Sequence, residues 1–198
     1  MLMKNLNKRV IPRICVLVGV CLLVVGAIVL ISWQWNIHSS MQKTESYVQT
    51  LRTLMPNPQG AVPEERRDNA MSIFSIEGTD FVGILEIPRY ESSLPVCADW
   101  GHLTKYPCQF NGSVYDRTMQ IGATSQKGQY DFYREISIGD TILFTDMEGN
   151  RYTYEVTNLR YEKHSNQTVL ERDDSALTLF IKNVYDFEYL IVSCDIAY

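Results

Sequence analysis

The sequence predicts a mainly β domain of about 120 residues, a small barrel or sandwich, behind one N-terminal apolar helix. Two observations lead to this fold class. The run from Ile14 to Trp33 contains no charged residue, and from about Ile76 onward short strands alternate with turn signals. The first segment has the length of a membrane span, and the second is long enough to build one hydrophobic core.

The uncharged run from Ile14 to Trp33 is typical of a membrane anchor. A helix of that length rises about 30 Å, the thickness of the hydrocarbon layer of a bilayer. A buried core helix would show a polar stripe, and a cleaved signal peptide would have a shorter apolar region followed by small residues. The segment after the run lacks such a cleavage site, and Trp33 and Trp35 suit the membrane interface. We therefore expect a retained transmembrane anchor over residues 14–35.

The charges around this run predict its orientation. Four cations precede it, namely Lys4, Lys8, Arg9 and Arg13, and the next lysine is Lys43. The positive-inside rule then places the N-terminus in the cytoplasm and the C-terminal domain outside the cell membrane, in a single-pass topology. All 23 Asp and Glu residues and 14 of the 18 Lys and Arg residues follow the run, which gives that part a formal net charge of −9. So acidic a domain argues against a nucleic-acid partner.

Apolar residues at three- and four-residue intervals follow the anchor, at Ile37, Met41, Thr44, Val48, Leu51 and Met55. They predict an amphipathic helical stalk that ends before Pro56. Its apolar face has three alternative destinations: the stalk of another chain, the chain's own domain, or the membrane surface. The expected division is a cytoplasmic basic tail (1–13), the anchor (14–35), a helical stalk and linker (36–75) and the β domain (76–198).

One hairpin is predicted in detail. Tyr152, Tyr154 and Val156 alternate with polar residues within the strand Arg151–Glu162, which gives the strand a buried and a wet face. The preceding Met147–Asn150 segment holds the glycine and asparagine that a tight turn needs. The other predicted strands are Phe81–Pro88, Thr141–Asp146, Leu177–Asn183 and Tyr189–Ala197, and a short helix is predicted at Asp131–Ile136.

The five cysteines divide between two regions. Cys15 and Cys21 lie in the anchor, where they are expected to be small apolar fillers, with lipidation sites as the alternative. Cys97, Cys108 and Cys194 lie in the outer domain, where oxidation would allow one disulfide with one thiol left over, and the sequence does not assign the pair. No CxxC or clustered Cys/His spacing indicates a metal, and there is no glycine-rich phosphate loop, so we expect no metal and no cofactor.

Several motifs, taken in order, resemble a sortase domain, most closely one of class B or D. They are Val82–Pro88 with Leu94–Val96, Gly112–Tyr115 with Ile121–Ser125, Ile138–Ile142, and Leu177–Lys182. The resemblance covers roughly residues 80–198, and the order of the motifs agrees with the predicted strands. It implies a closed β-barrel with short helices at a Gram-positive cell surface, and the N-terminal anchor suits it.

Sortases are cysteine transpeptidases that cut a sorting signal and join it to an amine of the cell wall or of a pilus. This chemistry needs a cysteine thiolate, a histidine that protonates the leaving amine and an arginine that stabilises the oxyanion. The resemblance places Thr124 at the histidine position, Lys182 at the cysteine position and Tyr189 at the arginine position. Threonine cannot act as a general acid near pH 7, and an acyl-lysine would be an amide that is hard to release. We therefore expect no catalytic residues at these positions.

The structural reading of Lys182 is that its head reaches solvent or pairs with Asp186 or Glu188. The enzymatic alternative is a displaced nucleophile, for which the outer-domain thiols Cys97, Cys108 and Cys194 are the candidates. His102 lies between the first two, and His164 lies in a polar loop expected to face water. The alternation of Cys194 with Val192 and Ile196 favours a packed core thiol instead.

The sequence thus favours a membrane-anchored, extracytoplasmic sortase-fold pseudoenzyme. Its expected role is to bind a peptide or a cell-surface protein partner, or to act as a scaffold in surface assembly, because a fold can persist while its site takes another use. Two alternatives stay open: an active transpeptidase with a displaced cysteine, and a structural membrane subunit that oligomerises through the stalk.

Overall fold

The computed structural model describes residues 3–64, 69–125, 129–130, 133–163, 174–183 and 188–197. The side chains of residues 3–17 and 33–41 lie outside this description. The chain divides into two compact units, residues 1–39 and 40–198. His164 falls outside the described residues, so the prediction that it faces water stays a prediction.

The first unit is helical and belongs to helix α1 (Met3–Leu54), which continues into the second unit. Large apolar side chains between residues 18 and 32 are exposed on this helix, among them Leu22, Leu23 and Ile31. In the part of the chain that the structure describes, no helix combines the length and the apolar character needed to cross a bilayer. The predicted anchor extends on both sides beyond residues 18–32, whose side chains are described.

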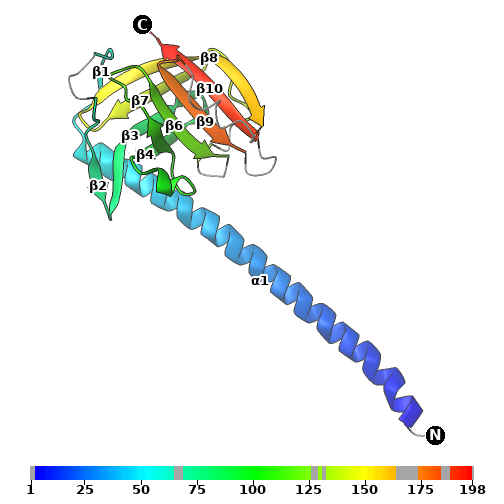
Figure 1. Cartoon of the computed structure of the whole chain (residues 1–198). Helices are drawn as coiled ribbons and strands as arrows, with labels where there is room; N and C mark the ends of the chain where they lie inside the picture. The colour runs from blue at the N-terminus through cyan, green and yellow to red at the C-terminus, as the bar shows by residue number, and fades with distance from the viewer. Residues whose placement is uncertain are drawn as a thin grey trace. The chain divides into compact units, whose positions relative to one another are not determined.

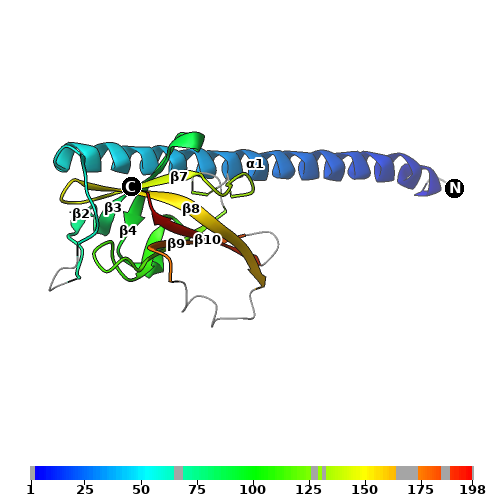
Figure 2. The ribbon, with the colours of Figure 1, turned by 90° about the horizontal axis from the view of Figure 1, so that it is seen from above.

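Eight strands of the second unit form a closed barrel. Around the ring the strands follow the order β8-β10-β9-β6-β5-β4-β3-β7, and β7 pairs with β8 to close it (Figures 1 and 2). Their bounds are β3 (Thr79–Ile87), β4 (Ser92–Cys97), β5 (Cys108–Asn111), β6 (Met119–Thr124), β7 (Thr141–Asp146), β8 (Asn150–Lys163), β9 (Leu177–Lys182) and β10 (Glu188–Ile196).

Two short strands and two short helices complete the described elements. Strand β1 (Gln59–Gly60) lies beside β8, and β2 (Phe74–Ile76) lies beside β3. The 3-10 helices are η1 (Pro88–Tyr90) and η2 (Trp100–His102). The predicted mainly β barrel with short helices is therefore confirmed. The helix predicted at Asp131–Ile136 lies partly outside the described residues, and residues 133–135 form a turn instead.

The hairpin of β7 and β8 agrees with its prediction. Thr145 lies opposite Arg151 and Phe144 lies opposite Tyr152, so the register leaves a short turn between the strands. Gly149 in this turn has a φ of 83°, a left-handed conformation that glycine adopts without steric cost. The predicted inward side chains of β8 are buried, whereas Glu155 between them is exposed.

Two hydrophobic clusters hold this unit together. The larger fills the barrel, and β6, β9 and β10 contribute residues such as Ile121, Ile181 and Leu190 to it. The smaller lies under the end of α1, where Val48 and Leu51 pack against Phe81 of β3. The apolar face of residues 44–55 thus lies on the chain's own barrel, one of the three destinations that the stalk pattern left open.

The Gly-Asp turn before β7 fastens this strand to η1. Gly139 has a φ of 90°, and Asp140 accepts hydrogen bonds from Arg89 Nη1 at 2.6 Å and from the Ser137 amide at 2.9 Å. The Tyr90 hydroxyl also contacts this carboxylate, at 3.1 Å. Burial acts to raise the pKa of Asp140, but the hydrogen bonds from Arg89, Ser137 and Tyr90 outweigh it, so the pKa is lowered.

Candidate functional site

The three positions that the resemblance singled out lie side by side. Thr124 at the end of β6 is the register partner of Lys182 at the end of β9. Lys182 is in turn the partner of Tyr189 at the start of β10. Three residues that are 58 and 7 positions apart in the sequence therefore meet at one end of three adjacent strands. The structure brings the predicted site together.

These three side chains stand on the outer face of the barrel. Their neighbours one residue earlier or later in the strands, Ala123, Ile181 and Leu190, belong to the interior cluster. Because successive side chains of a strand point to opposite faces of the sheet, Thr124, Lys182 and Tyr189 point outward. The candidate site is thus a surface of the sheet at the barrel's end.

Thr124 is held by a buried glutamine. Both its backbone amide and its hydroxyl Oγ1 donate to Gln129 Oε1, each at 2.9 Å. Gln129 Nε2 donates in turn to the Leu103 carbonyl at 3.5 Å. Thr124 and Gln129 are both buried, so these bonds satisfy groups that would otherwise lose their water. The threonine side chain is thus held in a structural hydrogen bond at the position that the resemblance assigns to the sortase histidine.

Backbone hydrogen bonds tie the strand ends together beside these residues. The Ser125 amide donates to the Lys182 carbonyl at 2.9 Å, and the Asn183 amide donates to the Glu188 carbonyl at 2.8 Å. Ser125 Oγ lies 3.5 Å from Asn183 Oδ1. Gln129 and Asn183 carry no local sequence pattern that indicates a functional role. Both are polar residues of connecting segments, and their burial depends on pairing between distant strands, which no local pattern reports.

Lys182 and Tyr189 are the half-buried members of the trio. Lys182 makes no ion pair with Glu188, and no described carboxylate pairs with it; Asp186, the other predicted partner, lies outside the described residues. Burial raises the pKa of Tyr189, so its phenol keeps its proton at neutral pH. The site therefore presents an ammonium and a phenol, both of which can donate hydrogen bonds to an oxygen-bearing ligand.

An aromatic group covers the same face one step away from the site. Gly122, two residues before Thr124, has no side chain, and the indole of Trp100 occupies the space where a Cβ would stand. Trp100 packs on Phe110 with a centroid separation of 4.8 Å, and Phe110 contacts Phe180 of β9 edge-on. Trp100 and Phe110 are 38% and 41% exposed, so the cover is itself partly open to solvent.

The other predicted nucleophile candidates do not join this site. Cys194 is fully buried in the barrel interior, and Cys97 and Cys108 are fully buried in the smaller cluster under α1. The structure shows no disulfide among these three described cysteines. His102 lies in η2, 3.8 Å from the carboxylate of Asp99. Among the described residues, no three or more His, Cys, Asp or Glu side chains lie together in a way that could hold a metal ion.

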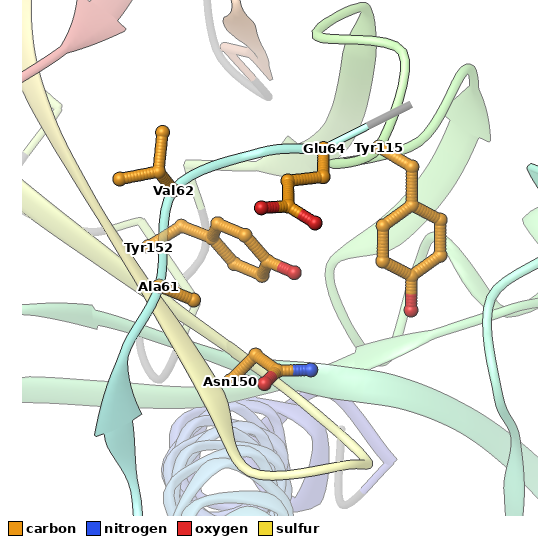
Figure 3. A pocket seen from close by; sticks show the side chains of 6 residues that line it. All are labelled: Ala61, Val62, Glu64, Tyr115, Asn150 and Tyr152. Carbon is orange, nitrogen blue, oxygen red and sulfur yellow. The ribbon is translucent and has the colours of Figure 1, made fainter. Parts of the chain in front are cut away.

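A pocket of about 250 Å³ lies at the opposite end of the strands. Figure 3 shows the Glu64 carboxylate and the Tyr152 hydroxyl in this space, with Asn150 below them. Asn150 and Tyr152 are the first and third residues of β8, whereas the last residue of that strand, Lys163, pairs with Glu188 next to Tyr189. Asn150, Tyr152 and the nearby Tyr115 already donate to the buried Asp146 carboxylate. This pocket and the candidate site are separate.

Similarity to solved structures supports the fold independently of the sequence motifs. No family model and no curated protein matches this sequence. Solved structures do match, among them sortase C-3 from Streptococcus pneumoniae, with 17% identity, 82% of this chain and 84% of that chain covered, and a TM-score of 0.52. Sortase C1 from Streptococcus agalactiae is similar with 18% identity, coverage of 63% and 71%, and a TM-score of 0.51. Sortase A from Listeria monocytogenes is similar with 18% identity, coverage of 60% of this chain and 88% of that chain, and a TM-score of 0.50.

These similarities confirm the fold that the motifs predicted: the barrel of residues 79–196 has the sortase fold. At identities of 17% and 18%, these similarities show the fold alone; they do not assign a sortase class or an activity to this chain.

Proposed function

We propose that this chain is a membrane-anchored sortase-fold protein that binds a peptide segment of a cell-surface protein and does not transfer it. One observation carries the proposal. The three positions where the resemblance expects a catalytic set adjoin one another at the ends of β6, β9 and β10, and they hold a hydroxyl, an ammonium and a phenol. The framework is retained, whereas the chemical groups are different.

The occupants of this site are poorly suited to acyl transfer. Thr124 Oγ1 donates its hydrogen bond to Gln129 and has no proton equilibrium near neutral pH. A lysine in place of the nucleophile would form an amide with the acyl group, and a neutral phenol supplies no positive charge to an oxyanion. Loss of a whole catalytic set elsewhere lowers turnover on the order of 10⁶-fold, which leaves binding as the use of the site.

The same groups are suited to binding. Lys182 offers a donor to peptide carbonyl or carboxylate oxygens, and Tyr189 lies beside it. The half-exposed Trp100 and Phe110 lie nearby on the same side of the sheet. A peptide with an apolar residue next to an oxygen-rich group fits this arrangement. It matches the expected partner, a peptide or cell-surface protein.

Binding is tested with the full chain in detergent and a fluorescent sorting-signal peptide, by anisotropy. We expect Lys182→Ala to weaken binding about tenfold, the effect of losing a hydrogen bond from a charged donor. Lys43→Ala, a change at an exposed lysine on α1, is the matched control and should leave the affinity unchanged. Equal binding by all three proteins would remove Lys182 from the site.

The enzymatic alternative is tested with a quenched sorting-signal peptide and an amine. We expect no cleavage, because Cys97, Cys108 and Cys194 are fully buried and away from the trio. Cleavage that disappears on changing one of these cysteines to alanine would overturn the non-catalytic proposal. Cleavage that persists in all three variants would point to a nucleophile of another type.

The anchor is the second part of the proposal. Its support is the uncharged run from Ile14 to Trp33, the basic tail before it, and the exposed apolar side chains of residues 18–32. The proposed location is the cell membrane, with the barrel on the outer side. Carbonate extraction of membranes and protease digestion of intact cells test it: the chain should stay in the pellet, and the barrel should be digested from outside.

The structural alternative is oligomerisation through the stalk, but part of the stalk's apolar face already packs on the chain's own barrel. Val48 and Leu51 are already packed on Phe81. Crosslinking of the full chain in detergent, compared with a variant in which residues 36–43 are replaced by a Gly-Ser sequence, distinguishes the cases. Oligomers lost on replacement would support assembly through this segment, and a monomer in both cases would exclude it.

A further inference from the structure

Two of the three outer-domain cysteines face each other across neighbouring strands. Cys97, the last residue of β4, is the register partner of Cys108, the first residue of β5. The Cys97 amide donates to the Pro107 carbonyl at 2.8 Å, which fixes the strands at this point. Neighbouring strands lie about 4.8 Å apart. That spacing is inside the range of about 4.4–6.8 Å between the Cα atoms of a disulfide.

The two thiols also contact one another. The contact between their side chains, together with burial, raises the pKa of Cys108. The Cys108 thiol also lies 3.2 Å from the Tyr106 carbonyl. Both side chains are fully buried in the cluster under α1. The sulfur atoms are thus already neighbours, in surroundings that shield them from solvent.

The third thiol lies in another part of the barrel. Cys194 lies on β10, opposite Leu177 of β9 and Val156 of β8, inside the barrel. β10 pairs with neither β4 nor β5, so Cys194 is remote in register from the other two. The sequence allowed any of three pairings with one thiol left over, and the fold favours one of them.

We propose that Cys97 and Cys108 form a disulfide and that Cys194 stays a thiol. In this step the two S–H bonds break, one S–S bond forms, and two protons and two electrons leave. The electrons reduce an external disulfide, that of an oxidised thiol–disulfide oxidoreductase or of oxidised glutathione, to two thiols. This inference rests on the chain's own geometry and not on the proposed peptide binding.

Two steps form the bond. The thiolate of one cysteine attacks the external disulfide, and the other cysteine then resolves the mixed disulfide. Because both sulfurs are fully buried in the folded domain, the bond should form while the chain folds. Once formed, it is shielded from reductants in solution.

The link would fasten the segment that covers the candidate site. Residues 98–107 lie between the two cysteines and carry Trp100, which packs on Gly122, and Leu103, whose carbonyl accepts from Gln129. Gly122 lies two residues before Thr124 on β6. Gln129 accepts a hydrogen bond from the Thr124 hydroxyl. A disulfide at the base of this loop therefore restrains two of the contacts that shape the site's surroundings.

Peptide mapping of the full chain, refolded in detergent with oxidised and reduced glutathione, tests the proposal. Free thiols are alkylated after denaturation, and the protein is digested without reduction. We expect the Cys97 and Cys108 peptides to be joined, a mass lower by two hydrogen atoms, and Cys194 alkylated. Alkylation of both Cys97 and Cys108, or a joined peptide containing Cys194, would overturn it.

Thermal unfolding gives a second measurement. A bond that closes a loop of about twelve residues should raise Tm by roughly 5–10 °C in the oxidised protein relative to the reduced one. The double variant Cys97→Ser/Cys108→Ser should show no such difference, and Cys194→Ser should keep it. If a variant fails to fold, the difference in Tm between oxidised and reduced wild-type protein still tests the proposal. An equal Tm for oxidised and reduced wild-type protein would contradict the proposed stabilising link.

Discussion

Lys182 lies opposite Thr124 in the parallel ladder of β6 and β9, on the outer face of a barrel whose interior begins one residue away. This relationship means that position 182 presents its side chain to solvent at one end of the strands. The residue there is half-buried, in contrast to the fully buried Thr178 four residues earlier on the same face.

We predict that Lys182→Cys creates a thiol that iodoacetamide labels in the folded chain. In reduced protein, Cys97, Cys108 and Cys194 are fully buried and should label only after unfolding. Thr178→Cys is the matched control on the same strand and face, and it should label slowly. Mass spectrometry of a labelling time course measures both rates. Equal rates at positions 178 and 182 would contradict the described exposure.

The bond between Thr124 and Gln129 leads to a second prediction. Gln129→Leu removes the acceptor of both the Thr124 amide and its hydroxyl, so two buried donors lose their partner. We expect a loss of about 1–3 kcal/mol in the free energy of unfolding. Thr124→Val removes only the hydroxyl and keeps the shape, so it should cost less. Urea denaturation measures both, and a larger loss for Thr124→Val would contradict the geometry.

The ion pair between Arg89 and Asp140 predicts a dependence on pH. The pKa of Asp140 is lower in the folded chain than its ordinary value of about 3.9. Its contribution to stability is therefore complete above that ordinary value and is lost as the pH falls through the lower, folded-state pKa. We expect Asp140→Asn to be less stable than wild type at pH 7 and to lose less stability on acidification. Urea denaturation at pH 7 and pH 3 measures this.

Glu155→Gln, at an exposed position of β8, is the control for the Asp140 experiment. It changes the same type of charge at a site where no described side chain pairs with it. A pH dependence altered equally in both variants would assign the effect to net charge and not to the Arg89 contact.

The end of α1 carries one buried and one exposed leucine, which together test how this helix packs on the barrel. Leu51 is 0% exposed against the barrel, whereas Leu54, one turn later, is 57% exposed. Leu51→Ala should lower the free energy of unfolding by about 2–5 kcal/mol, as for other buried leucines. Leu54→Ala should change it little. Thermal and urea unfolding of the full chain in detergent measure both, and similar effects would mean that this helix end does not pack on the barrel.

The sequence predicted those parts of the fold whose signal is local. The alternation at Tyr152, Tyr154 and Val156 and the glycine turn at Gly149 define the β7–β8 hairpin within 25 residues of chain, and the structure agrees. Asp131–Ile136 has helical composition, yet residues 133–135 form a turn, because packing at the barrel's end decides a segment of one or two turns.

The site was predictable only through the family resemblance, which named Thr124, Lys182 and Tyr189 from three separate motifs. Their adjacency depends on the parallel pairing of β6 with β9, which no local pattern encodes. The facing cysteines show the same limit. Cys97 and Cys108 are close in sequence, but their opposition depends on the parallel pairing of β4 with β5.

The parallel ladder of β6 and β9 also has a consequence for how the domain folds. It joins residues 119–124 to residues 177–182, with the whole β7–β8 hairpin in the connection between them. Closing so long a loop is slow compared with forming a hairpin, so we expect β7 and β8 to pair early and the ladder late. A nascent chain would therefore bring Thr124, Lys182 and Tyr189 together only after β9 and β10 have left the ribosome, and until then β6 lacks the strand that pairs with it on that side.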